Sequence, residues 1–137
     1  MAESGGGRVV NVSSSSGKRP SRRLDAPYSV TKAAQLSLSR YFAESWAAEG
    51  VLVNAVAPGP IEGDSWTAPG GLAEQIAARA GSTPEEVLQG TRAGVPLGRM
   101  GTDEEIAAVV VFLCSELASN VTGVAWSVDG GSVPTIV

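Results

Sequence analysis

A tyrosine and a lysine four residues apart are the side chains of this sequence best suited to acid–base chemistry. Tyr28 and Lys32 lie near the start of a segment that predicts a helix, so this spacing puts both on one helical face. An ammonium group a few ångströms from a phenol stabilises the phenolate form, and the positive end of the helix acts in the same direction. Such a tyrosine can exchange a proton with a hydroxyl or carbonyl oxygen near neutral pH. By itself the pair is a weak signal, because an aromatic stem beside a solvated lysine is a common structural arrangement.

A run of serines upstream supplies hydroxyl groups that can hold the same oxygen. Ser13 to Ser16 and Gly17 follow the β-branched segment Arg8 to Val12, which predicts a buried strand that enters a loop. Residues 18–27 are polar and predict a continued loop. Pro27 then opens a predicted helix that runs to about Glu49 and ends at a capping glycine.

The rest of the chain alternates predicted strands and helices. Val51–Ala57 predicts a second strand, Leu72–Ala80 a short helix and Val124–Val128 a third strand. Capping boxes that begin at Thr83 and Thr102 predict two further helices, the second of which runs to about residue 119. Near-continuously apolar strands separated by helices predict an α/β fold with a parallel sheet and right-handed crossovers.

The predicted topology brings three loops together. In a parallel α/β sheet, ligands bind beyond the carboxyl ends of the strands. Here those ends are residues 13–17, 58–63 and 129–132, which we expect on one side of the sheet. Asn54 is expected to satisfy backbone groups between strand and loop, and Asp129 to act as a turn residue.

The helix that follows Thr102 is apolar nearly all round, so we expect it to be deeply packed. Cys114 lies inside its apolar run and is expected to be a small core residue. This run, Ile106 to Cys114, has nine residues and is too short to span a membrane.

Composition excludes several function classes. The chain has 137 residues and a net charge of −4, which argues against a nucleic-acid or anionic-membrane surface. It has no histidine and one cysteine, which excludes a Ser-His-Asp triad, histidine metal sites, an internal disulfide and a cysteine zinc site. The first residues lack the basic and apolar regions of a signal peptide, so a cytoplasmic location is expected.

Several motifs, taken together, closely resemble the short-chain dehydrogenase/reductase family. They are the serine run, Tyr28–Lys32 (Tyr-Ser-Val-Thr-Lys), Val53–Pro60 (Val-Asn-Ala-Val-Ala-Pro-Gly-Pro), Gly98–Gly101 and Val128–Gly131. The resemblance implies a partial Rossmann-like, doubly wound parallel sheet in which residues 8–137 are the C-terminal half of the domain. It also implies an NAD- or NADP-dependent oxidoreductase that interconverts a secondary alcohol and a ketone.

The resemblance assigns catalytic roles to three side chains. Tyr28 corresponds to the general acid/base of the family, and Lys32 to its partner, which also holds the nicotinamide ribose. Ser14 corresponds to the serine that positions the substrate oxygen, because it lies three residues before a glycine, as the serine of the family does. Its separation from Tyr28 is one residue longer than usual, so Ser13 and Ser15 remain alternatives.

The resemblance also implies contacts with the cofactor and the substrate. Pro58, Gly59 and Ile61, with Tyr28 and Lys32, are expected against the nicotinamide nucleotide, and Gly63 stands where relatives usually have a threonine. Residues 62–98 correspond to the substrate loop of the family. Four apolar residues there are expected either to line a substrate pocket or to pack the loop on the core: Trp66, Leu72, Ile76 and Val95.

The glycine-rich phosphate loop of a dinucleotide-binding domain has no match in this sequence. Gly5–Gly7 precede the first strand and open no helix, so residues 1–7 are interpreted as a flexible leader. We therefore expect the N-terminal dinucleotide-binding half to be missing, and we hypothesise that Met1 is an internal methionine of a longer reading frame. The alternatives to an active oxidoreductase are a truncated, non-catalytic remnant or oligomerisation module, and a half-enzyme that needs a separate cofactor-binding half.

The long helix over residues 28–49 has two apolar faces, one for the sheet and one with which family members pair subunits. A homo-oligomer is therefore expected, together with a small-molecule substrate and no nucleic-acid or membrane partner. The identity of the substrate and the choice between NAD and NADP stay open at this point.

Overall fold

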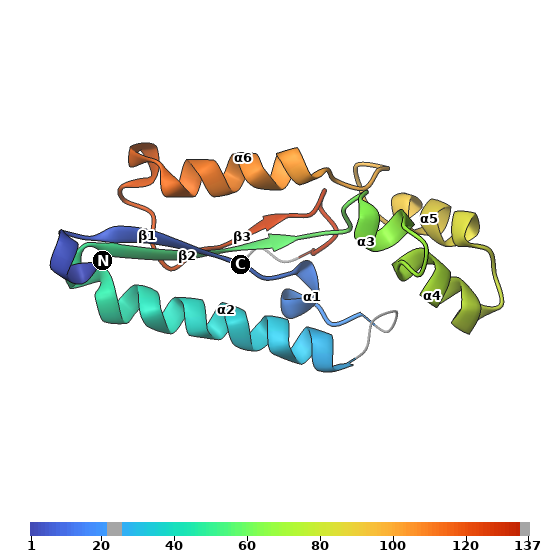
Figure 1. Cartoon of the computed structure of the whole chain (residues 1–137), viewed down its shortest axis with the longest axis horizontal. Helices are drawn as coiled ribbons and strands as arrows, with labels where there is room; N and C mark the ends of the chain where they lie inside the picture. The colour runs from blue at the N-terminus through green and yellow to red at the C-terminus, as the bar shows by residue number, and fades with distance from the viewer. Residues whose placement is uncertain (22–25, 135–137) are drawn as a thin grey trace.

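The computed structural model describes residues 1–21 and 26–134. Three strands, β1 (Gly7–Val12), β2 (Val51–Pro58) and β3 (Ala125–Val128), form one sheet in the order β1-β2-β3. Both strand pairs are parallel, with Val9 opposite Val53 and Val56 opposite Trp126. The predicted α/β fold with a parallel sheet is confirmed (Figure 1).

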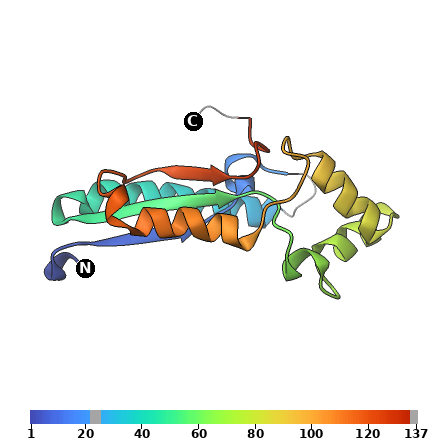
Figure 2. The same cartoon turned by 90° about the horizontal axis from the view of Figure 1, so that it is seen from above.

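Helices cover both faces of this sheet. The long helix α2 (Ala26–Trp46) and the short helix α1 (Ser15–Lys18) lie on one face, and α6 (Asp103–Cys114) lies on the other (Figure 1). Three further helices cluster beyond the carboxyl end of β2: α3 (Asp64–Thr67), α4 (Leu72–Ala80) and α5 (Pro84–Ala93). Figure 2 shows this α3–α5 cluster projecting past one end of the sheet. Single 3-10 turns occur over Ala2–Ser4, Ala47–Glu49 and Glu116–Ala118.

Helix ends follow the local signals in the sequence. The helix α2 continues as a 3-10 turn to Glu49, and Gly50 then closes it with a φ of 74°, a conformation that favours glycine. Both predicted capping boxes are present, with Thr83 and Thr102 each accepting from the backbone N–H three residues later. The last helix ends earlier than predicted, because Ser115 takes an extended conformation after Cys114.

Three segments differ from the loops expected of them. The serine run does not stay a loop, since Ser14 caps the short helix α1. The helix α3 was not predicted. Residues 1–7, expected to be a flexible leader, include a 3-10 turn over Ala2–Ser4, and the Gly7 N–H donates to Gly50 O at 3.1 Å. Of the predicted loop 18–27, residues 22–25 lie outside the described residues.

Burial is uneven across the sheet and its helices. The central strand β2 is buried along most of its length, whereas every residue of β1 is at least partly exposed. The prediction of a buried first strand was wrong, because β1 has a strand neighbour on one side only in the part of the chain that the structure describes.

The expectation of a deeply packed α6 was also wrong. Among its residues only Leu113 is buried, Val111 is 67% exposed, and Cys114 is exposed rather than in the core. One face of α6 covers the sheet, and its apolar outer face is open within residues 1–21 and 26–134. An apolar sequence pattern alone does not distinguish a helix buried on all sides from a helix with one open face, since burial depends on what packs against each face.

Two polar side chains have the structural roles that the sequence predicts. Asn54, 1% exposed, donates from Nδ2 to Val121 O at 2.8 Å and accepts the Val124 N–H at Oδ1 at 3.1 Å. Asp129 accepts two backbone N–H groups, those of Gly131 and Val133, each at 2.9 Å. These bonds join β2 to the chain that enters β3 and shape the turn that leaves β3.

Candidate active site

All three strands of the sheet end at one large cleft. Its volume is about 1190 Å³, and the α3–α5 cluster forms its far wall. The chain after β1 contributes Ser14–Ser16, the chain after β2 contributes Gly59 and Pro60, and the chain after β3 contributes Ser132 and Val133. The prediction that these strand ends meet on one side of the sheet is confirmed.

The three candidate serines have different surroundings. Ser13 is buried, and its Oγ donates to the backbone oxygen of Lys32 at 2.8 Å, so this hydroxyl is directed at α2. Ser14 caps α1, where its Oγ accepts the Ser16 N–H at 3.1 Å. Since that bond uses an oxygen lone pair, the hydroxyl hydrogen of Ser14 stays available to a ligand. Both Ser14 and Ser15 line the cleft, and Ser13 does not.

Tyr28 and Lys32 lie together on the first turns of α2. Tyr28 lines the cleft and is 42% exposed. The Lys32 Nζ lies 5.9 Å from the centre of the Tyr28 ring. It donates to Val12 O at 3.0 Å and to Gln35 Oε1 at 3.3 Å. Lys32 therefore lies behind Tyr28 rather than in the cleft wall, with its ammonium bound to the end of β1.

The helices α1 and α2 approach each other closely, and this approach holds Ser14 and Ser15 beside Tyr28. A Cβ added to Gly17 would lie 2.8 Å from the backbone carbon of Lys32, so only glycine fits there. On the opposite side, Lys18 Nζ donates to Ala125 O at 2.5 Å and to Ser127 Oγ at 3.0 Å, which ties α1 to β3. The sequence analysis did not find this role of Lys18, and no local signal indicates it, because 107 residues separate the partners.

Only some of the residues expected against the nicotinamide line the cleft. Gly59 lines the cleft, and its N–H donates to Val128 O at 3.0 Å. Its Cα faces the turn after β3 so closely that an added Cβ would lie 2.7 Å from Asp129 Cα. Pro58 ends β2 and does not line the cleft, and Ile61 instead pairs with Gly101 in an isolated β-bridge. Gly63 precedes α3 and offers no side-chain cap.

The far wall of the cleft carries apolar side chains beside polar ones such as Gln75 and Arg79. All four residues that the sequence proposes for a substrate pocket line it: Trp66, Leu72, Ile76 and Val95. Trp66 also packs against the buried cluster of Ala73, Leu88 and Met100. The two interpretations offered by the sequence, pocket lining and packing, therefore hold at the same time for this tryptophan.

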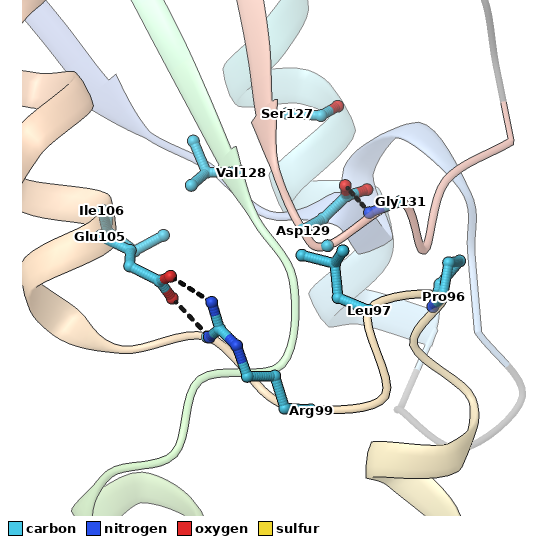
Figure 3. Close-up of a pocket in the computed structure, with 11 residues that line it drawn as sticks. Pro96, Leu97, Arg99, Glu105, Ile106, Ser127, Val128, Asp129 and Gly131 are labelled. Carbon is cyan, nitrogen blue, oxygen red and sulfur yellow. Dashed lines mark hydrogen bonds and ion pairs between the residues drawn. The ribbon is translucent and has the colours of Figure 1, made fainter.

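A second cavity of about 530 Å³ lies on the α6 side of the sheet (Figure 3). Arg99 makes two hydrogen bonds to Glu105 there, at 2.9 and 2.5 Å. These bonds and the Thr102 N–H lower the pKa of the Glu105 carboxyl to about 2. Because its charged side chains are paired with each other and Asp129 is bound to backbone N–H groups, this cavity presents little unpaired polar chemistry.

The same part of the chain lacks two further kinds of feature. Residues 1–21 and 26–134 contain no group of three or more His, Cys, Asp or Glu side chains placed to hold a metal ion. Over the same residues, no helix combines the length and the apolar character needed to cross a bilayer.

Sequence and structure comparisons identify the family. A family model described as enoyl-(acyl carrier protein) reductase matches residues 1–133. The chain is 42% identical to the 3-oxoacyl-(acyl-carrier-protein) reductase FabG of Aquifex aeolicus over 125 residues, 91% of this chain and 44% of that protein. It is 37% identical to an acetoacetyl-CoA reductase of Rhizobium meliloti over 132 residues, 96% of this chain and 48% of that protein.

A solved structure agrees with these relatives. L-sorbose reductase of Gluconobacter frateurii, in complex with NADPH and L-sorbose, superposes with a TM-score of 0.86 at 31% identity, covering 99% of this chain and 51% of that one. The chain belongs to the short-chain dehydrogenase/reductase family, and its sheet is Rossmann-like. It spans about half the length of the relatives that it matches.

Proposed function

We propose that this chain carries the acid–base half of an NAD(P)-dependent oxidoreductase that interconverts a secondary alcohol and a ketone. One observation carries the proposal: the side chains of Ser14 and Tyr28 line the same cleft, and the ammonium of Lys32 lies directly behind the tyrosine. The family membership and the NADPH-bound structural relative support the same chemistry.

The proposed reaction needs a proton and a hydride on opposite ends of one carbonyl bond. A nicotinamide cofactor held beside Tyr28 and Gly59 would provide the hydride chemistry. Ser14 Oγ donates a hydrogen bond to the carbonyl oxygen and orients it, and the Tyr28 hydroxyl transfers its proton to that oxygen as the alcohol forms. Lys32 stabilises the phenolate that remains, since a positive charge close behind the ring favours the anionic form. In the reverse direction the phenolate of Tyr28 removes the proton of the alcohol.

The described residues fit only the reactive end of such a cofactor. The cleft offers about 1190 Å³ of open volume beside Tyr28 and Gly59. In residues 1–21 and 26–134 no strand is joined to a helix by a turn with the glycine spacing Gly-x-Gly-x-x-Gly, which is the arrangement that cradles a pyrophosphate. We therefore propose a half-enzyme in which residues outside this chain supply the dinucleotide-binding half, with either NAD or NADP as the cofactor.

The experiment compares the chain alone with a completed enzyme. The part of the Aquifex reductase that this chain does not match is produced separately and added, and oxidation of NADPH or NADH is followed with acetoacetyl-CoA as the ketone. We expect no cofactor fluorescence change with the chain alone and turnover after complementation.

Tyr28→Phe is expected to lower kcat of the completed enzyme by about 10²–10⁴-fold without changing the melting temperature. The matched control is Tyr41→Phe, which removes a hydroxyl from the exposed face of the same helix. Tight binding of NADPH by the chain alone would contradict the half-enzyme, and full activity of Tyr28→Phe would contradict the catalytic assignment.

We also propose that the chain self-associates through α2. This helix exposes several large apolar side chains, among them Val30 and Tyr41, which are 66% and 65% exposed. Leu38, Phe42 and Trp46 extend this surface, and contiguous apolar patches on a helix are typical of protein interfaces. Light scattering at micromolar concentration is expected to give a mass above that of a monomer. A monomer under these conditions would exclude α2 as a homo-oligomer interface and, with it, the association-module alternative.

A further inference from the structure

The ammonium of Lys32 has two acceptors. One is the backbone oxygen of Val12, the last residue of β1, at 3.0 Å. The other is the side-chain oxygen of Gln35, one helical turn further along α2, at 3.3 Å. A lysine ammonium has three N–H donors, so these bonds leave one N–H for a ligand or water.

Gln35 lies on a turn of α2 that is itself bound to the sheet. Its backbone oxygen accepts the hydroxyl of Ser39 at 2.7 Å, and that hydroxyl accepts the Asn11 Nδ2 of β1 at 2.8 Å. Ser39 is only 3% exposed, so this link lies in the interface between helix and sheet. The acceptor for Lys32 therefore belongs to a turn held against β1 at a second point.

We propose that Gln35 is a positioning residue that holds the ammonium of Lys32 behind Tyr28. The inference rests on the proposed function, in which that charge stabilises the Tyr28 phenolate. A lysine stem has four rotatable bonds, so one bond to Val12 leaves the ammonium several positions, whereas a second acceptor on the neighbouring turn restricts it. A neutral amide oxygen does this without cancelling the positive charge, which a carboxylate at the same place would do.

The test uses the fact that the sequence contains two lysines only, Lys18 and Lys32. In protein labelled with 15N at lysine Nζ, NMR at low temperature gives one ammonium signal for each. Lys18 is an internal control, because its acceptors, Ala125 O and Ser127 Oγ, lie on β3 and away from Gln35. The matched variants are Gln35→Met, which keeps the length of the side chain without the acceptor, and Gln35→Glu, which keeps an acceptor.

In Gln35→Met we expect the hydrogen exchange of the Lys32 ammonium to accelerate by about tenfold or more, because this charged group loses one hydrogen bond. The Lys18 signal is expected to stay unchanged. In Gln35→Glu the Lys32 ammonium is expected to stay protected. An unchanged Lys32 signal in Gln35→Met would overturn the proposal. If both lysine signals change in Gln35→Met, Gln35→Glu decides: a protected Lys32 supports the proposal, and an unprotected Lys32 contradicts it.

Activity of the complemented enzyme provides an independent measurement. Gln35→Met is expected to lower kcat by about tenfold with little change in KM, because the ammonium acts on the proton-transfer step. If Tyr28→Phe inactivates the enzyme and Gln35→Met leaves kcat unchanged, the positioning proposal fails and the proposed function stands. If no complemented enzyme turns over, the proposed function fails, and the Lys32 signal still decides whether Gln35 holds the ammonium.

Discussion

The sheet body, made of β1–β3 with α1, α2 and α6, and the α3–α5 cluster contribute to the cleft in different ways. The sheet body contributes the hydroxyl groups of Ser14 and Tyr28 to the cleft wall, and behind Tyr28 it holds the Lys32 ammonium on the backbone oxygen of Val12. The cluster contributes the far wall, with the apolar side chains of Trp66, Leu72 and Ile76. Its helices pack mainly on one another, around a small core of Ala73, Leu88 and Met100 that is separate from the core of Ala43, Val51 and Val53 beneath the sheet.

The segments around Ile61 and Gly101 lie side by side and connect the sheet body to the α3–α5 cluster. Ile61 pairs with Gly101 in a β-bridge, and Gly101 both donates to Pro60 O and accepts from the Glu62 N–H, each at 2.9 Å. Arg92 of α5 adds an ion pair to Glu62 at 2.5 Å. Under the proposed function, the sheet body would supply the reacting groups and the α3–α5 cluster would select which molecules fit the cleft. Three substitutions test whether the two regions are independent.

Asn54→Ala is expected to have the largest effect, on the sheet body. It removes the bonds to Val121 O and Val124 N, and each backbone group left without a partner costs about 1–3 kcal/mol. We expect the free energy of unfolding to fall by about 2–5 kcal/mol in chemical denaturation. The control is Asn120→Ala at an exposed position, expected to change stability by less than about 0.5 kcal/mol. A loss for Asn54→Ala as small as that of the control would mean that the link between β2 and β3 is not stabilising.

Met100→Ala tests the core of the α3–α5 cluster. Met100 is 2% exposed, and removal of a buried methionine side chain costs about 2–5 kcal/mol where the neighbours do not collapse. Because this core is separate, we expect the loss of stability to appear as easier local opening of α4 and α5, measured as faster amide hydrogen exchange. The amides of β2 are expected to keep their protection. Equal loss of protection in β2 and α4 would show that the two regions unfold as one unit.

Glu105→Gln has the smallest expected effect and depends on pH. Arg99, in the segment that leads back from the cluster, lowers the pKa of this carboxyl from its ordinary 4.5 to about 2 in the folded protein. A lowered pKa stabilises the fold above pH 4.5, and this stabilisation is lost as the pH falls towards 2. Glu105→Gln is therefore expected to lower the melting temperature at neutral pH, with a difference that shrinks below pH 4.5.

Glu44→Gln, which removes an exposed carboxylate of α2, is the control for this pH dependence. We expect its melting curve to follow that of the unsubstituted protein at every pH. A Glu105→Gln deficit that persists undiminished near pH 2 would show that the ion pair is not its source.

Local signals predicted the elements well. Leu72–Ala80 has the predicted bounds, and the capping boxes at Thr83 and Thr102 open helices where expected, because a cap involves residues only three positions apart. The predictions that failed concern burial. The open edge of β1 and the exposed Val111 and Cys114 of α6 depend on what packs against them, and an apolar pattern carries no information on that.

Prediction of the candidate site from the sequence has the same limit. Tyr28, Lys32 and the serine run could be chosen from the sequence, since their types and spacing define the chemistry. The direction of the Ser13 hydroxyl, the bond from Lys32 to Val12 O and the role of Lys18 could not be predicted. Their partners lie 19, 20 and 107 residues away along the chain.

The sequence by itself determined most of the helices and strands, including the bounds of α4 and the first turns of α5 and α6, and which side chains are able to transfer a proton, because these follow from residue type and short-range spacing. The tertiary structure decided that Ser14, Ser15 and Ser16 but not Ser13 line the cleft, and that the backbone oxygen of Val12 accepts from the Lys32 ammonium. It also decided that four apolar residues of the 62–98 segment face that cleft. These outcomes depend on contacts between segments far apart in the chain, and such contacts exist only once the sheet has brought those segments together.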